Sequence, residues 1–212
     1  MSKFGLDIGC GTAMLNQAHK GYPQFTWIGI DKADFTRFYP VSRFYRHDVI
    51  DYLPFANHSF GMIWCHHMLE HLPPIHPYAG RGFHLGAEDW LVWLVNEMWR
   101  VLEPGAQAHL IVPWNEHANS WRDPTHYRHM DASYFAWFDW TVMQAVHESA
   151  KLWSKWKVHR SDVVDQCHVY GILEALEWAP GEREAVVGPL SQDWKAIDLK
   201  KESHVPTITL QE

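Results

Sequence analysis

The chain has 212 residues, which is enough for one α/β domain with a sizeable buried core. Hydrophobic residues make up 47% and charged residues 20%, proportions typical of a globular protein. The formal net charge is −7 and Lys and Arg form no block, which argues against a protein dedicated to nucleic-acid binding. Cys10, Cys65 and Cys167 lie far apart without a CxxC pair, which disfavours a zinc ribbon or a disulfide framework.

No segment reads as a signal peptide or a membrane span. An apolar strand and a glycine turn begin almost at once, and the longest strongly apolar run, near 90–95, is far too short to cross a bilayer. With its unpaired cysteines, the chain is therefore expected in a reduced, cytoplasmic compartment.

The first half of the chain alternates predicted strands with helices. A short buried strand at 4–8 is followed by a helix at 12–20, with Thr12 as its N-cap. The clearest helix spans 88–102, because its apolar residues recur at helical spacing, and Pro104-Gly105 is expected to end it. Further strands are predicted at 26–31, 43–48, 60–65 and 108–112.

The second half gives weaker signals. An aromatic-rich helix is predicted at 133–152, and strands at 157–164, 168–176 and 205–210. Alternating strands and helices favour a mainly parallel sheet covered on both faces. The fold class is therefore α/β, with a single doubly wound, Rossmann-like sheet.

The turn after the first strand carries the strongest chemical signal. Gly9 and Gly11 allow the backbone to approach a ligand closely, but Met14 occupies the third position of a GxGxxG fingerprint. The missing glycine weakens a pyrophosphate-binding interpretation. Asp7, two residues before Gly9, suits a ligand with an amino group and no phosphate, such as S-adenosylmethionine (SAM).

Two further acids stand at predicted strand ends. Asp31 follows Gly11 by 20 residues, where an acid reaches the ribose hydroxyls of a bound nucleoside. Asp48 ends the third predicted strand, where its carboxylate can accept a hydrogen bond from an adenine amino group. Acids at three successive strands are hard to explain as solvated surface.

The chain resembles the class I SAM-dependent methyltransferases, especially the broad group that acts on small molecules, lipids and sugars. The resemblance covers about residues 4–114. It rests, in the family's order, on LDIGCGTA, GIDK, RHDVIDYLPFANHSFGMIWCHHMLEHL and RVLEPGAQAHLIVP. It implies a single domain over 1–212 with an antiparallel last strand, in which 1–114 form the cofactor-binding half and 115–212 the substrate side. It also implies methyl transfer from SAM, with S-adenosylhomocysteine as product.

The resemblance also assigns cofactor residues by position. Those at the methionine end are Asp7, Gly9, Cys10 and Gly11; those at the ribose are Asp31 and Lys32; those at the adenine are Asp48 and Val49; and those beside the cofactor at the fourth strand end are Cys65 and His66. Gly61 stands where the family commonly has an acid, and Ala106 replaces a glycine. The N-terminal helix that often covers the site is also missing from this sequence, which leaves open what covers the pocket.

The acceptor is expected beyond the fourth and fifth strands. The substrate candidates are Glu70, His71, Trp114, Arg122 and His129, and the catalytic candidates are His126 and His67. His126 is preferred because an imidazole can accept a proton near neutral pH. The alternative interpretations are that His67, Glu70 and His71 cap a helix, and that 115–130 is an exposed connection.

No metal is expected. Histidines and Asp123 offer ligand atoms, but histidine is common throughout the chain and no recognised zinc spacing accompanies them. Two other function classes remain open: a catalytically silent SAM-binding scaffold and an NAD-dependent oxidoreductase, the latter disfavoured by Met14. The sequence does not identify the acceptor, the methylated element or the oligomeric state.

Overall fold

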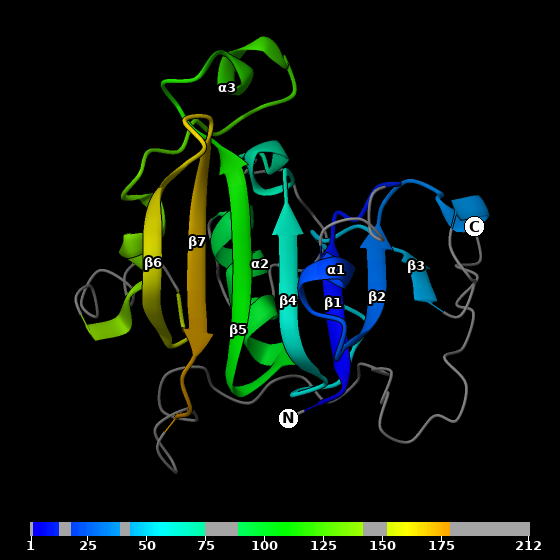
Figure 1. Ribbon diagram of the computed structural model, residues 1–212. Coiled ribbons are helices and arrows are strands. Elements are labelled where there is room, and N and C mark those ends of the chain that lie inside the picture. Colours follow the sequence, from blue (N-terminus) through cyan, green and yellow to red (C-terminus); the bar gives the residue numbers. More distant parts are fainter. Residues whose placement is uncertain (1, 13–17, 39–42, 75–88, 142–151, 179–212) are drawn as a thin grey trace.

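A computed structural model describes residues 2–12, 18–38, 43–74, 89–141 and 152–178 (Figure 1). Its centre is one mixed sheet of seven strands. The strands are β1 (Phe4–Ile8), β2 (Thr26–Asp31), β3 (Phe44–Arg46), β4 (Phe60–His66), β5 (Leu102–Pro113), β6 (Trp156–Val164) and β7 (His168–Ala175).

The strand order is β3-β2-β1-β4-β5-β7-β6. The first five strands in this order pair in parallel, whereas β7 runs antiparallel to both β5 and β6. The carboxyl ends of the parallel strands therefore share one edge, at the top of Figure 1, where the start of β7 also lies. Ligands of open α/β sheets bind at this edge.

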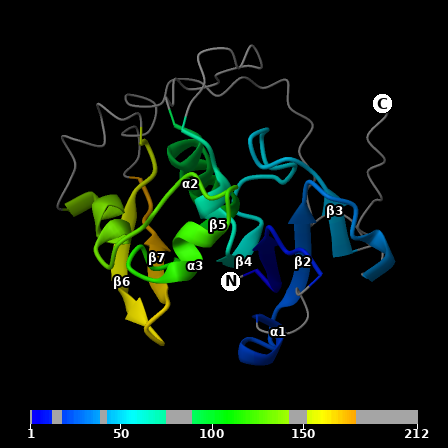
Figure 2. The ribbon, with the colours of Figure 1, turned by 90° about the horizontal axis from the view of Figure 1, so that it is seen from above.

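Helices lie on both faces of the sheet, as the sequence predicts (Figure 2). The α-helices are α1 (Ala18–Gly21), α2 (Trp90–Val101) and α3 (Ala118–Arg122), and the 3-10 helices are η1 (Thr36–Phe38), η3 (Leu69–His71) and η4 (Tyr134–Phe138). α2 is buried from Leu91 to Val101, and the Asp89 carboxylate caps it by accepting hydrogen bonds from the backbone N–H groups of Leu91 and Val92. Because its apolar residues face the sheet, α2 covers the main core.

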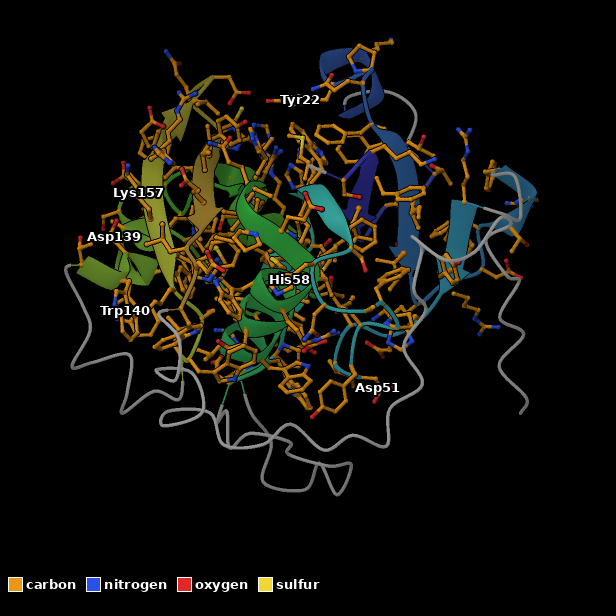
Figure 3. All side chains as sticks on the ribbon, turned by 90° about the horizontal axis from the view of Figure 1, so that it is seen from below. Tyr22, Asp51, His58, Asp139, Trp140 and Lys157 are labelled. Carbon is orange, nitrogen blue, oxygen red and sulfur yellow. The ribbon has the colours of Figure 1, made fainter. Side chains whose placement is uncertain are left out.

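The opposite face carries a smaller aromatic cluster. Trp27 and Met62 are buried there, and Tyr22, Phe25 and Trp64 pack against them. Figure 3 shows Tyr22 on the α1 side of the sheet, whereas Asp51 and Trp140 lie on the α2 side. In the part of the chain that the structure describes, no helix is long and apolar enough to cross a membrane.

Most predicted strands are confirmed, with shifted bounds. The third is shorter than predicted, so Asp48 lies two residues beyond β3, while β5 is much longer than 108–112. The helix predicted at 88–102 is confirmed as α2, and it ends before Pro104-Gly105 as predicted. α2 ends at Val101 and β5 begins at Leu102, so both residues lie within β5, where Gly105 takes a positive φ of 79°.

The predicted helix at 133–152 is wrong over its first turns, which form the short helix η4 followed by an extended C-cap at Asp139. The remainder, 142–151, lies outside the described residues, as do residues 13–17 of the predicted helix at 12–20 and the predicted strand at 205–210. The strands predicted at 157–164 and 168–176 are confirmed as β6 and β7.

One buried histidine makes stability depend on pH. His109 on β5 is 4% exposed, its Nδ1 accepts a hydrogen bond from the Tyr170 hydroxyl, and its Nε2–H donates to Gln107 Oε1. Burial lowers the pKa of His109 from 6.5 to about 4. Between these two values the unfolded chain binds a proton that the folded chain does not, so the free energy of unfolding falls as the pH decreases.

We therefore expect His109→Gln, which cannot titrate, to flatten this dependence. The parent should lose about 2 kcal/mol more than the variant between about pH 7 and pH 5, at about 1.36 kcal/mol per pKa unit. Urea unfolding of both proteins at the two pH values measures the difference. Equal losses in the parent and the variant would contradict the assignment.

Candidate functional site

The chain turns sharply after β1. Gly9 and Gly11 take positive φ values of 68° and 49°, and the backbone N–H groups of Gly9 and Cys10 both donate to the Ile30 carbonyl, at 2.9 and 3.2 Å. A Cβ at Gly9 would lie 2.5 Å from the Met68 side chain. The turn therefore needs glycine at this position, and it lies against the segment that follows β4.

Asp31, at the end of β2, holds this turn in place. Its Oδ2 accepts a hydrogen bond from the Gly11 N–H at 3.0 Å, and its Oδ1 accepts one from the Ala33 N–H at 2.9 Å. Each carboxylate oxygen can accept a further hydrogen bond, so the side chain can still receive ribose hydroxyls. The acid therefore has a structural contact besides the predicted binding role.

Asp7 lies within β1, and its side chain is buried. Burial first, and then the negative charge of Asp31, raise the pKa of Asp7 well above its ordinary value. A bound cation beside Asp7 would reverse this effect by favouring the ionised carboxylate. The buried acid therefore provides a suitable environment for the α-ammonium of SAM.

The other predicted cofactor residues differ in what they expose. Cys10 packs its side chain in a small cluster with Phe44, and Cys65 is fully buried in the main core. Lys32 is exposed and Val49 is buried. Asp48 Oδ1 accepts from the Ile50 N–H at 3.3 Å in the turn after β3. The two thiols therefore support the edge by packing and present little or no side-chain surface to a ligand.

Two consecutive histidines lie at the end of β4, His66 as its last residue and His67 directly after it. His67 takes a positive φ of 54°, and its ring lies 4.4 Å from that of His66 between centroids. Burial, followed by the neighbouring His67 and His168, lowers the pKa of His66 to about 4. His66 is therefore neutral near pH 7.

Glu70 in η3 connects β4 to the segment after β5. It is 1% exposed, and its Oε1 lies 3.1 Å from His67 Nδ1. Its backbone carbonyl accepts hydrogen bonds from the Tyr127 and Arg128 N–H groups. Its Oε2 has no hydrogen-bond partner among the residues that the structure describes. The predicted "LEH" unit thus forms a 3-10 helix whose acid points inward and is not a cap.

A hollow of about 490 Å³ lies between the end of β4 and the segment 115–130. It is lined by His67, Pro113, Asn119, Arg122, Asp123, Pro124 and His126. His126 Nδ1 donates to the Ser120 carbonyl at 3.0 Å, which leaves Nε2 as the proton-accepting nitrogen of the neutral ring. Asp123 Oδ2 lies 3.8 Å from that Nε2. The two predicted catalytic histidines therefore line one hollow.

The remaining acceptor candidates lie around this hollow. His71 Nδ1 contacts Thr125, and its ring lies 4.7 Å from that of His126. His129 stacks on Trp121 at 3.6 Å, with its Nδ1 at 3.0 Å from Ser120 Oγ. Of the predicted set, only Arg122 joins His67 and His126 in the lining; Trp114 packs against the main core.

Sequence reasoning missed His168, which lies 4.9 Å from His67 between ring centroids. His168 begins β7 and pairs with Pro113 in the antiparallel ladder, which brings it to the carboxyl edge of β4 and β5. The sequence predicts the strand at 168–176, but only the antiparallel pairing of this strand with β5 places His168 at the carboxyl edge.

The glycine turn, the acid of β2 and the antiparallel β7 beside β5 together define a class I methyltransferase fold. The family model "Methyltransferase domain" matches residues 6–110. The chain belongs to the class I SAM-dependent methyltransferase superfamily, and SAM is its cofactor. A search of curated protein sequences found no match.

Solved structures share the fold at low sequence identity. YcgJ from Bacillus subtilis is 16% identical, with a TM-score of 0.53, over 84% of this chain and 93% of YcgJ. A SAM-dependent methyltransferase from Archaeoglobus fulgidus is 16% identical, with a TM-score of 0.52, over 82% and 86%. A variant 16S rRNA adenine-N1 methyltransferase from Catenulisporales acidiphilia with its cosubstrate SAM is 13% identical, with a TM-score of 0.51, over 84% and 86%.

Proposed function

We propose that this chain catalyses methyl transfer from SAM to a small-molecule acceptor held in the hollow between His67 and His126. The observation that carries the proposal is the place of this hollow. It opens beyond the carboxyl ends of β4 and β5, on the same sheet edge as the Gly9–Gly11 turn. An acceptor in the hollow and a cofactor on the turn would therefore meet along one edge.

On the cofactor side, Asp7, Gly9 and Gly11 bind the methionine end, and Asp31 binds the ribose. The raised pKa of Asp7 supports the first assignment, because a cation is the partner that would stabilise its ionised form. Asp48 and Val49 flank the adenine. Asp48 was predicted to end the third strand, but β3 ends at Arg46, so Asp48 lies two residues beyond it.

On the acceptor side, the hollow of about 490 Å³ is a shallow depression that is open to solvent, so an acceptor would lie in it partly exposed. Arg122 and Asp123 offer opposite charges at its wall, and Pro113 and Pro124 offer apolar surface. This lining suits a polar small molecule, or the polar end of a lipid or sugar, better than a long nucleic acid, since the chain carries a formal net charge of −7.

Methyl transfer from a sulfonium depends mainly on placing the acceptor in line with the methyl group. A base is needed when the acceptor loses a proton in the transition state. His126 is the base of choice, because its Nδ1 bond to Ser120 orients the ring and leaves Nε2 to accept that proton. His67 is the second candidate, with Nδ1 held by Glu70.

Two measurements test the proposal. SAM and S-adenosylhomocysteine should raise the thermal midpoint, because ligands that bind only the folded state stabilise it, whereas NAD should not. Incubation of the chain with SAM and a panel of small polar acceptors should then produce S-adenosylhomocysteine. Binding without product over a broad panel would favour the silent SAM-binding scaffold. A cytoplasmic location remains a prediction.

Asp31→Ala should weaken SAM binding by about 1.5–3 kcal/mol, the usual range for hydrogen bonds to charged groups. Part of this loss would come from releasing the Gly11 N–H, which Asp31 holds at 3.0 Å. The matched control is Asp34→Ala, because the exposed Asp34 carboxylate bonds locally to Thr36. Calorimetry of both variants should show a loss in the first and parental affinity in the second. Equal affinities would remove Asp31 from the site.

A further inference from the structure

Three histidines from distant parts of the chain meet at the edge of the sheet. His66 ends β4, His67 follows it directly, and His168 begins β7 about 100 residues later in the sequence. One ring nitrogen of each lies within 4.8 Å of one from each of the others. A tetrahedral Zn²⁺ ion holds imidazole nitrogens about 3.4 Å apart, given Zn–N distances of about 2.0–2.1 Å, so modest ring rotations would close the set on an ion.

The backbone conformation of His67 creates this convergence. Successive side chains of a strand point to opposite faces, so two adjacent histidines do not ordinarily meet. The positive φ of 54° at His67 turns its ring back toward His66, to 4.4 Å between centroids. A non-glycine residue rarely takes this conformation, and such conformations cluster at functional sites.

Carboxylates orient two of the three rings. Glu70 Oε1 lies 3.1 Å from His67 Nδ1, and both carboxylate oxygens of Asp165 lie within 3.0 Å of His168 Nδ1. A carboxylate accepts a hydrogen bond from Nδ1–H, so Nε2 is the nitrogen left with a lone pair. This pairing of a carboxylate with each ligand is what orients histidines in metal sites and raises their basicity.

We propose that His66, His67 and His168 bind a divalent transition-metal ion through three imidazole nitrogens, with Zn²⁺ as the type ion. Borderline metals suit imidazole ligands, whereas Ca²⁺ and Mg²⁺ prefer oxygen. His67 also lines the hollow, so the proposed metal site adjoins it. A metal-bound His67 would have no free Nε2, which would leave His126 as the base of the proposed reaction.

A second cluster competes for the ion. Glu70, His71 and His126 also place one ligand atom each within 4.8 Å of one another. The three-histidine set is favoured because Glu70 already bonds His67 through Oε1, and because two of its rings are held by carboxylates. The bonds of His71 and His126 go to Thr125 and to a backbone carbonyl. A third group, Asp165, Cys167 and His168, shares His168 with the proposed set. The test must therefore separate all three groups.

Co²⁺ is the probe, because its visible absorption reports the ligands directly and needs no methyl acceptor. The full chain, stripped with a chelator, should bind one Co²⁺ with absorption bands of nitrogen ligation, and Zn²⁺ should abolish the bands. His66→Gln and His168→Gln should each remove them, whereas retention of the bands in His66→Gln would assign the ion to Asp165, Cys167 and His168 and overturn the proposal. The matched control is His159→Gln on the neighbouring strand β6, because the exposed His159 pairs with Glu174 across the hairpin and belongs to none of the three groups found among the described residues.

A second variant protects the test against misfolding. Asp165→Asn changes an exposed turn residue and should weaken Co²⁺ binding about 10–100-fold, the usual effect of losing a carboxylate that orients a ligand. Circular dichroism would check the fold of each variant. Absence of Co²⁺ bands in the parent, or equal affinity in the parent, His168→Gln and Asp165→Asn, would overturn the proposal. Loss of the bands in His71→Gln with retention in His168→Gln would assign the ion to the other cluster and also overturn it.

Discussion

Arg100→Met is expected to lower the free energy of unfolding by about 3–5 kcal/mol, the usual result of breaking a buried ion pair from one side. Arg100 and Glu97 are almost fully buried in α2, and two guanidinium nitrogens donate to the Glu97 carboxylate at 2.7 and 2.6 Å. Arg100 also donates to the backbone carbonyls of Leu53 and Phe55. Removing it leaves the Glu97 charge and both carbonyls buried without these partners.

Urea unfolding measures this change, and Arg160→Met is its control. Arg160 makes a comparable ion pair with Asp162, but both side chains are exposed, so its loss should cost no more than about 1 kcal/mol. Similar losses in the two variants would contradict the argument from burial. Arg100 and Glu97 fix residues 53–57, which lead into the amino end of β4, opposite the candidate site.

The cofactor half of the fold could be predicted because its signals are local. β1, β2 and β4 are short apolar runs that end at a glycine turn, an acid and a histidine pair, as buried parallel strands do. The spacing of apolar residues predicted α2. Pro104-Gly105 predicted the end of α2 to within a residue, but it did not predict that β5 begins directly at Leu102, which pairs with Phe60.

The second half could not be predicted because its structure depends on distant contacts. The aromatic run at 134–138 has the composition of a helix, but Phe135 packs against Gly171 of β7, and its backbone N–H donates to Ser161 Oγ of β6. These contacts fix a 3-10 turn where local spacing indicated an α-helix. The sequence did not predict His168 as a site residue for the same reason, since only the β5–β7 pairing places it beside His67.

The candidate site shows the same division. Asp7, Gly9 and Gly11 lie close together in the sequence, so a short motif is enough to find them. The hollow is lined from the end of β4, the end of β5 and the segment around α3, and only folding brings these together. The sequence placed His67, Arg122 and His126 together beyond the fourth and fifth strands, but it did not show which of the seven candidates line the hollow.

His126→Ala should reduce turnover by about 10²–10⁴-fold, the usual contribution of a general base, while SAM affinity stays close to that of the parent. Its Nδ1–H is fixed on the Ser120 carbonyl at 3.0 Å, so its Nε2 can accept a proton from an acceptor in the hollow. Since the cofactor assignments lie on or shortly after β1, β2, β3 and β4, the substitution removes none of them. Calorimetry for SAM and S-adenosylhomocysteine formation with an identified acceptor measure the two quantities.

His126→Asn separates the base from the structural bond, because its amide can still donate to the Ser120 carbonyl but cannot accept a proton at neutral pH. If His126 acts as a base, the Asn variant should be as slow as the Ala variant. If the ring only shapes the loop, Asn should restore much of the turnover. His159→Ala, on the exposed face of β6, should leave both turnover and SAM affinity unchanged. A large loss of SAM affinity in His126→Ala would move this segment to the cofactor side, and unchanged turnover would remove His126 from the mechanism.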